Sequence, residues 1–353
     1  MRGGPAGQQG TACREGRGAA PGPARGAAGP AGGQSQDHDT PSKWAIRDAR
    51  RRRRDNGGRG GRAGGVLHRV QRPTTGQAPA QQAFRAVGDI VTELASLPRW
   101  ERVGSLGIAS AGPVDISRGT VSPVNIPGWR GFPVVDRVRA LLAAAGLRVS
   151  LCGDAVAMTA AEHWIGAARG CRDALCMVVS TGVGAGLVMD RAVRNGPTGN
   201  AGHLGHVTVD LLGDPCPCGS QGCVEQLASG PSMVRRALGQ GWQPSGRADG
   251  QDPAADARAG DASALAASDV AARALAAAAA AVATLVEIGV AVIGGGVAEA
   301  HDVLFPPLRR HLTAYAVPPF AAGVRIRRAA LRPDAGLVGA AFLAADLEPT
   351  GIG

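Results

Sequence analysis

The chain is poor in aromatic residues and almost devoid of lysine. Aromatic side chains make up 3% of the 353 residues, and Lys43 is the one lysine among 38 Lys and Arg residues. Ala and Gly are abundant instead, so a core must be built from small aliphatic side chains. The excess of arginine over lysine indicates a GC-rich coding sequence more than a physical need.

Segments typical of secretion or membrane insertion are also lacking. The N-terminus has no apolar segment of the kind found in signal peptides. One apolar run, near residues 271–286, approaches the roughly 20 residues of a membrane helix, but Arg273 interrupts it and helical sequence flanks it. We therefore expect a cytoplasmic protein without a membrane partner.

Positive charge is concentrated at the start of the chain. The net charge is +10, but residues 1–65 hold 13 Lys and Arg against 5 Asp and Glu, and the remainder holds 25 against 23. A nucleic-acid partner is therefore not expected for the body of the chain. The run Arg50–Arg54 could touch nucleic acid or acidic lipid, although charge runs are more often simply solvated.

Composition separates residues 1–65 from the rest of the chain. The first segment is Gly, Ala, Pro and Arg with few aliphatic side chains, so it cannot bury enough surface to offset the entropy of ordering, and we expect disorder. From Val66 onward strand and helix patterns alternate, which indicates an α/β fold with mainly parallel central strands. Expected strands lie at 66–73, 103–115, 148–154, 290–296 and 324–329, with two further strands around a Gly-rich turn within 174–189. Expected helices lie at 78–97, 133–145, 155–167, 223–238, 263–288, between the strands at 290–296 and 324–329, and after Gly336; loops are expected at 122–129 and 240–262.

Residues 199–230 concentrate side chains that bind metals. The candidate ligands are His206, Cys216, Cys218 and Cys223. One imidazole and three thiolates satisfy the tetrahedral preference of zinc and leave no open position, so the metal would be structural. Gly219 and Gly222 permit the tight turns that a chain folding around an ion requires. The alternative is buried thiols or a disulfide, but cysteines one residue apart pair poorly and cytosolic thiols stay reduced.

Asp154 follows an apolar segment and precedes a helical one. Ligands of open α/β sheets bind beyond the carboxyl ends of the strands, so a carboxylate there is either a helix N-cap or a catalytic group. Taken alone, capping is the simpler interpretation.

Two glycine-rich turns also follow apolar strands. Ser180–Gly186 lies between two such strands, and its backbone amides could hold phosphate oxygens. Gly294–Gly296 would suit a nucleotide lying against the backbone, although glycines also serve ordinary turns. The candidate cofactor-binding residues are Thr181, Gly182, Gly184, Gly294, Gly295 and Gly296.

Together these motifs resemble the ROK family of sugar kinases and related repressors. The resemblance runs from Val66 to about Ala345 and is carried by STGVGAGLV, GHLGH, CPCGSQGCVE, VIGGGVAEA and DAGLVGAA. It implies a two-lobed actin/hexokinase-like (ribonuclease H-like) ATPase fold, with residues 66–155 as the N-terminal lobe and residues 156–353 as the C-terminal lobe. A homodimer is expected from the resemblance alone.

The resemblance further implies ATP-dependent phosphorylation of a hexose at its 6-hydroxyl, with Mg²⁺ accompanying ATP and N-acylmannosamine or glucose as leading substrates. Asp154 matches the general-base position, where a carboxylate accepts the proton of the sugar hydroxyl. The implied sugar-binding residues are Asn125, His203, His206 and Glu225. One ring nitrogen of His206 could bind zinc while the other addresses the sugar, so the metal would hold the sugar site in shape.

Three positions depart from the family pattern. Many relatives have Glu where this chain has His203, and its GHxGH form is similar to bacterial N-acylmannosamine kinases. Gly153 stands where Asn usually precedes the catalytic Asp. The one candidate for the family's Asp-x-Gly-Gly-Thr phosphate loop, Asp55–Arg59, follows arginines instead of a buried strand. We hypothesise that a misassigned start or a reading-frame change has replaced the first hairpin, which would leave the chain weakly active or inactive.

Two other functions stay open. A sugar-responsive transcriptional regulator of the same family would need a helix-turn-helix, and residues 1–65 offer no amphipathic helix pair. A catalytically impaired, zinc-stabilised sugar-binding protein would keep the metal cluster and lose transfer chemistry. ATP consumption with a panel of hexoses separates the latter from a kinase.

Overall fold

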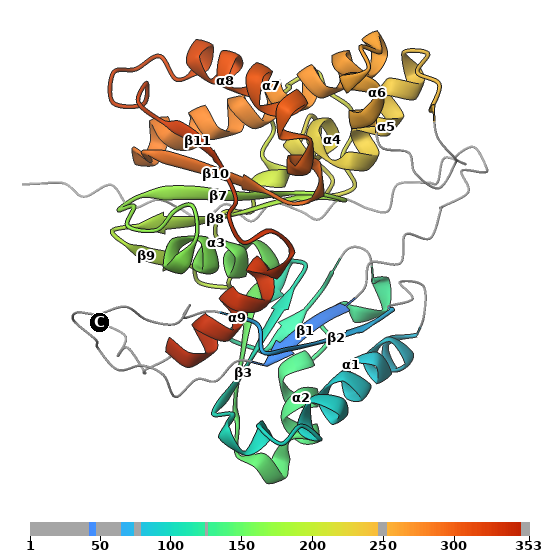
Figure 1. Ribbon diagram of the computed structural model, residues 1–353, viewed down its shortest axis with the longest axis vertical. Helices are drawn as coiled ribbons and strands as arrows, with labels where there is room; N and C mark the ends of the chain where they lie inside the picture. The colour runs from blue at the N-terminus through green and yellow to red at the C-terminus, as the bar shows by residue number, and fades with distance from the viewer. Residues whose placement is uncertain (1–41, 47–64, 74–78, 124–125, 246–252, 347–353) are drawn as a thin grey trace, which may run out of the picture. The chain divides into compact units, whose positions relative to one another are not determined.

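The computed structural model describes residues 42–46, 65–73, 79–123, 126–245 and 253–346 (Figure 1). Two groups of elements can be distinguished within these residues, one around a five-stranded sheet and one around shorter two-stranded sheets. Strands and helices alternate along the chain, which confirms the expected α/β class.

The larger group is built on a sheet with the strand order β11–β10–β7–β8–β9. Its strands are β7 (Ala174–Val179), β8 (Val183–Met189), β9 (Ala192–Arg194), β10 (Val290–Gly294) and β11 (Arg325–Arg328). β7, β10 and β11 run parallel, whereas β8 and β9 run antiparallel to their neighbours. The central strands β7, β10 and β11 are thus parallel as expected, whereas short turns join β7, β8 and β9, and such turns connect antiparallel strands.

Helices cover both faces of this sheet (Figure 1). One face carries α4 (Val224–Ala228), α5 (Gly230–Gly239), α6 (Pro253–Arg258), α7 (Ala262–Val286) and α8 (His301–Tyr315), and the other carries α3 (Asp154–Ile165) and α9 (Ala335–Asp346). Within β7, Leu175 and Met177 join the core on the α7 side, while Ala174 and Cys176 join the core on the α3 side. Successive strand side chains point to opposite faces, so a strand covered on both sides is apolar throughout.

α7 is the one helix among the described residues that is long and apolar enough to cross a membrane. Half of its most apolar window is buried inside the protein. Ala271, Ala276 and Ala279 are fully buried and belong to the same core as Leu304 of α8. We therefore interpret α7 as a core helix.

The smaller group combines three two-stranded sheets and two helices. β3 (Ser105–Ser110) runs parallel to β6 (Arg148–Gly153), β4 (Val114–Asp115) runs antiparallel to β5 (Thr120–Val121), and β1 (Ser42–Ile46) runs antiparallel to β2 (His68–Arg72). The helices are α1 (Ala80–Ala95) and α2 (Val134–Leu141). The apolar positions predicted at helical spacing, Phe84, Val87, Ile90, Val91 and Leu94, are all buried. Short 3₁₀ turns lie at Trp100–Arg102, Pro127–Trp129, Ala143–Ala145, Leu204–His206, Gly296–Ala300 and Arg332–Asp334.

The C-terminal helix α9 packs against α3 and against β3. A Cβ on Gly339 would collide with the carbonyl oxygen of Ala157 in α3, and a Cβ on Gly107 in β3 would collide with the carbonyl oxygen of Ala340. Glycine at these positions lets the backbones approach closely. The small residues of the DAGLVGAA motif therefore have a packing role.

Glu162 of α3 fixes the connection that leads into α9. Its carboxylate is fully buried and accepts hydrogen bonds from the backbone N–H groups of Ala167 (2.6 Å), Ala330 (3.1 Å) and Leu331 (2.8 Å). Three charge-assisted bonds satisfy a carboxylate that would otherwise be costly to bury. The N-terminal end of α9 is thus held to the same helix that begins at Asp154.

Several expected boundaries were wrong. β1 lies within the segment 1–65, for which we expected no regular structure; its pairing depends on the edge of β2, which local composition does not reveal.

The helix expected at 223–238 is broken at Ser229, which has extended backbone angles, because Pro231 begins a new helix and cannot continue the preceding one. The loop expected at 240–262 contains α6, where the carboxylate of Asp256 accepts from Trp242 Nε1 at 2.9 Å. α9 begins at Ala335, just before the expected start.

Candidate active site and metal centre

Asp154 is the first residue of α3, directly after β6. The N-cap position belongs to Gly153, so the capping interpretation of Asp154 is not supported. Its Oδ1 accepts a hydrogen bond from the N–H of Ala155 at 2.7 Å. The side chain is accessible to solvent, yet the surrounding protein atoms displace enough water that desolvation raises its pKa, which the hydrogen bond partly offsets. An accessible carboxylate of raised basicity is suited to accepting a proton.

The glycine-rich turn between β7 and β8 lies beside this carboxylate. A Cβ built on Gly184 would stand 4.0 Å from Asp154 Oδ1 and 3.0 Å from the Cβ of Ala155. The turn is closed by the N–H of Ser180, which donates to the carbonyl of Gly182 at 2.9 Å, and Thr181 at its tip is exposed. The exposed turn backbone and the candidate base are therefore neighbours.

The second glycine turn meets the first. Gly295 has φ +92°, and a Cβ there would collide with the carbonyl oxygen of Val179 at the end of β7. A Cβ on Gly296 would lie 3.6 Å from Ser180 Oγ, and Gly230 at the start of α5 donates its N–H to the Ser180 carbonyl at 2.8 Å. Gly296 thus borders the β7–β8 turn.

Gly294 and Gly295, the other two glycines of the turn after β10, have a packing role. Gly294, at the end of β10, is buried against Met158 and Ala329. Gly295 lets its own backbone approach the end of β7. Of the three glycines, Gly296 has the most space around its α-carbon.

His203, His206 and Glu225 lie close to one another near the start of β8. The rings of His203 and His206 stack with centroids 5.1 Å apart. The Glu225 carboxylate accepts from the N–H of Val183 at 2.9 Å and leaves no room for a Cβ at Gly182, which would lie 2.7 Å from Oε2. Desolvation and the nearby His206 lower the pKa of His203, although Glu225 acts in the opposite direction. His203 is therefore neutral at pH 7 and can donate or accept a hydrogen bond.

The four predicted metal ligands come together. The ligand atoms of His206, Cys216, Cys218 and Cys223 all lie within 4.8 Å of one another. Cys216 Sγ is 3.7 Å from His206 Nδ1, and Cys218 Sγ is 3.8 Å from Cys223 Sγ. Tetrahedral bonds of about 2.3 Å to sulfur and 2.0 Å to nitrogen give ligand edges of roughly 3.6–3.8 Å. The donor set and its spacing fit a structural zinc ion.

The local backbone also suits a metal loop. Gly219 and Gly222 have φ +95° and +59°, as expected from the sequence. A Cβ on Gly222 would collide with the backbone of Asp210, so this position requires glycine. Burial raises the pKa of Cys223 to about 12, so its thiolate would need a bound cation at neutral pH.

Some predicted residues are not placed, and some contacts were not foreseen. Asn125 and Asp55–Arg59 lie outside the described residues. Gly112, between β3 and β4, lies against His203: its Cβ would be 2.9 Å from Cε1 and 3.7 Å from Asn200 Oδ1. The sequence gives no local signal for these contacts, because they join segments that are far apart in the chain.

The fold and the site define a class of protein: a two-lobed α/β protein of the actin/hexokinase-like type, with a carboxylate and two glycine turns at adjoining strand ends. The chain belongs to the ROK family, whose family model matches residues 60–347. It is 32% identical over 294 residues to a glucokinase of Thermotoga maritima, covering 79% of this chain and 90% of that protein. It is 33% identical over 279 residues to an N-acetylmannosamine kinase of Citrobacter koseri, covering 79% and 91%. The crystal structure of a ROK family glucokinase from Streptomyces griseus in complex with glucose and AMPPNP is similar, with a TM-score of 0.66, 31% identity and coverage of 80% and 92%.

Proposed function

We propose that the chain is an ATP-dependent carbohydrate kinase that phosphorylates the 6-hydroxyl of N-acylmannosamine or glucose. The observation that carries the proposal is the position of the accessible Asp154 carboxylate beside Gly184 in the glycine-rich β7–β8 hairpin. Its relatives include proteins named glucokinase and N-acetylmannosamine kinase, and these names support the same class of reaction.

Asp154 acts as the general base. Its raised pKa makes the carboxylate a stronger base than an ordinary aspartate. Accepting the hydroxyl proton increases the electron density on the sugar oxygen as that oxygen attacks phosphorus. The base and the phosphate donor must therefore lie on opposite sides of that oxygen, which is consistent with a carboxylate next to an exposed backbone turn.

ATP with Mg²⁺ supplies the phosphoryl group and neutralises charge on it. The residues that would border its phosphates are Thr181, Gly182, Gly184, Gly294, Gly295 and Gly296. The exposed Thr181 tip and the neighbouring Gly296 offer backbone with no large side chain over it, which is what close approach of phosphate oxygens needs.

Asn125, His203, His206 and Glu225 bind the sugar. A hexose carries several hydroxyls, each needing a directed donor or acceptor, and a neutral imidazole provides one of each where a carboxylate only accepts. His203 therefore favours a different sugar contact from the Glu found in many relatives. Zinc on His206, Cys216, Cys218 and Cys223 would fix the orientation of His206 and with it this wall of the site.

A second copy of the chain is the proposed protein partner. A pocket of about 800 Å³ beside α7 is lined mainly by alanine, valine and leucine side chains, together with Asp210, Arg273, Thr284 and Tyr315. Leu285 is 80% exposed, and Leu211 and Leu212, which follow Asp210, are 79% and 95% exposed. Exposed leucines around an apolar pocket indicate a protein contact. We propose a cytoplasmic location. We propose no membrane partner and no nucleic-acid partner.

The decisive experiment measures ATP consumption by the purified protein with a panel of hexoses that includes N-acetylmannosamine and glucose. We expect turnover with at least one of the two and a loss of about 10²–10⁴-fold in kcat for Asp154→Asn, because the general base is removed. Asp190→Asn, a surface aspartate paired with Arg172, is the matched control and should retain activity.

Two other outcomes would change this proposal. Turnover that Asp154→Asn leaves unchanged would remove Asp154 from this role. Sugar binding by calorimetry without ATP consumption would indicate a sugar-binding relative that has lost transfer chemistry.

A further inference from the structure

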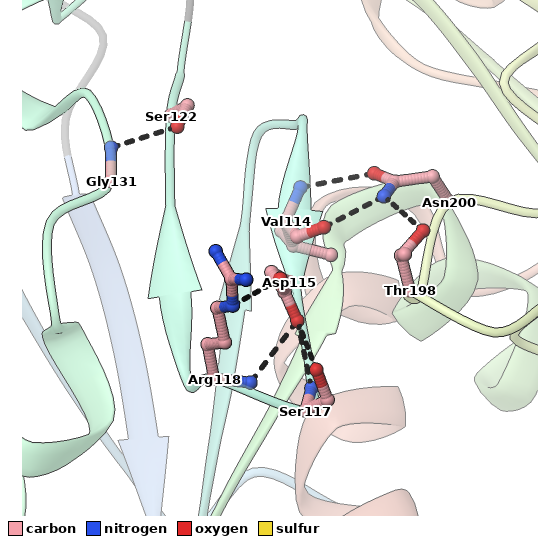
Figure 2. A network of polar contacts seen from close by, with 8 residues as sticks. All are labelled: Val114, Asp115, Ser117, Arg118, Ser122, Gly131, Thr198 and Asn200. Carbon is pink, nitrogen blue, oxygen red and sulfur yellow. Dashed lines mark hydrogen bonds and ion pairs between the residues drawn. The ribbon is translucent and has the colours of Figure 1, made fainter.

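Asn200 connects two segments that are far apart in the sequence. Figure 2 shows its side chain facing β4, where Oδ1 accepts from the N–H of Val114 at 3.0 Å and Nδ2 donates to the carbonyl of Val114 at 2.7 Å. Nδ2 also donates to Thr198 Oγ1 at 2.9 Å. A primary amide offers a donor and an acceptor side by side, so it can satisfy both backbone groups of one residue as a neighbouring strand would.

A backbone bond extends this contact. The N–H of Ile116 donates to the carbonyl of Thr198 at 3.0 Å. Gly199, with φ +96°, lies so close to Ile116 that a Cβ would be 2.5 Å from its Cγ2. Residues 198–200 therefore lie along β4 like a short additional strand, and Asn200 supplies the hydrogen bonds at one end of it.

This contact lies close to His203 and close to the residue that precedes Asp154. Asn200 precedes His203 by three residues, and a Cβ on Gly112 would be close to both side chains. On the other side, the carbonyl oxygen of Gly199 would lie 3.8 Å from a Cβ on Gly153, the residue before Asp154. A shift of residues 198–200 relative to β4 would therefore change the distance between His203 and the turn that contains Gly112.

We propose that Asn200 is a positioning residue for sugar binding, which holds the segment before His203 against β4 and so fixes the width of the sugar site. Its side-chain hydrogen bonds go to Val114 and Thr198 and not to the glycine turns or to Asp154. Its effect therefore falls on the sugar and not on ATP. The inference rests on the proposed kinase function and adds a residue outside the GHLGH motif.

The test compares Asn200→Ala and Asn200→Asp with the wild type in the full-length protein. The aspartate variant keeps the shape and the acceptor for the Val114 N–H, but places a second acceptor against the Val114 carbonyl. Ser122→Ala is the matched control, because Ser122 Oγ accepts one backbone hydrogen bond, from Gly131 at 2.9 Å, at the far side of the same hairpin (Figure 2).

We expect both Asn200 variants to raise the KM for the sugar by about tenfold, with kcat and the KM for ATP changed less than about twofold. Hydrogen exchange of the peptide that covers 111–118 should accelerate in these variants and not in the control. An unchanged sugar KM in a variant whose exchange has accelerated would overturn the inference while leaving the proposed function intact. If the wild type phosphorylates no sugar, the proposed function fails, and calorimetric sugar affinity decides the inference: equal affinity of wild type and Asn200→Asp would refute it.

Discussion

At the scale of single residues, the chemistry of the site depends on how Asp154 is surrounded. The side chain stands at the first turn of α3 and not at the N-cap, and the N–H of Ala155 donates to it. Desolvation outweighs this bond and raises the pKa above the ordinary value of 3.8. The surroundings thus make the carboxylate more basic while making its ionised form less stable.

A pH profile checks this assignment. Because the base works only when ionised, kcat/KM should fall as the pH drops through the raised pKa, so the acid limb begins at a higher pH than for an ordinary aspartate. Because the pKa of Asp154 is higher in the folded than in the unfolded state, the free energy of unfolding decreases as the pH rises through the folded-state pKa. Asp154→Asn should therefore lack the acid limb and unfold at a higher temperature than the wild type above the raised pKa, a difference that disappears below pH 3.8.

The matched control is again Asp190→Asn. Its pKa is lowered by hydrogen bonding to Arg172, so it stays ionised across the range and its removal should leave the acid limb in place. An acid limb shared by the wild type and the residual activity of Asp154→Asn would assign the titration to another group.

At the scale of elements, the cysteine loop and the β7–β8 hairpin form one unit. Glu225, two residues after Cys223, accepts from the backbone of Val183 in the hairpin, and Val224 N–H donates to Val207 next to His206. The metal loop is therefore hydrogen-bonded to the strand whose Gly184 lies beside Asp154.

Removal of the metal tests this coupling. Purified wild type should contain about one zinc ion per chain by elemental mass spectrometry, since four protein ligands form one closed site. Cys218→Ser should lose most of it, lower the unfolding midpoint by roughly 5 °C or more, and raise the sugar KM, because metal binding contributes to folding.

Cys171→Ser provides the comparison, as Cys171 is half-buried and outside the cluster. It should retain the zinc and the sugar KM. A wild type without metal, or a Cys218→Ser protein with full metal content, would contradict the structural zinc site.

At the scale of the whole molecule, we propose the lobes 66–155 and 156–353 with one amendment. α9 follows β11 of the larger sheet in the chain, yet it packs against β3 of the smaller group through Gly107 and Ala340. The buried Glu162 holds the connection between them. The C-terminal helix therefore packs against both lobes, against α3 through Gly339 and against β3 through Gly107.

The proposed homodimer can be tested on the surface of α7. Leu285→Glu places a charge among exposed leucines, and desolvating an unpaired charge should weaken dimerisation about tenfold or more. Sedimentation velocity over a concentration series should show the shift toward monomer. Leu141→Glu, which changes an exposed leucine of α2 (49% exposed), should leave the distribution unchanged; a wild type that is monomeric throughout would rule the dimer out.

The sequence by itself determined the features that depend on local pattern and on chemistry with strict spacing. The apolar face of α1 followed from helical periodicity. The Cys3His cluster followed from zinc's demand for four ligands, with Gly219 and Gly222 providing the turns between them. Alternation of strand and helix patterns along the sequence predicted the α/β class.

Only the tertiary structure decided the features that depend on contacts between distant segments. It showed the strand order β11–β10–β7–β8–β9, the separation of α4 from α5, and the position of Asp154 beside Gly184. The pairing of Asn200 with Val114 and the bonds of Glu162 to the backbone before α9 had no local signal, because a polar side chain finds its partner through the fold. Helical and strand periodicity is a property of consecutive residues, whereas the width of a binding site depends on contacts between residues that are far apart in the sequence.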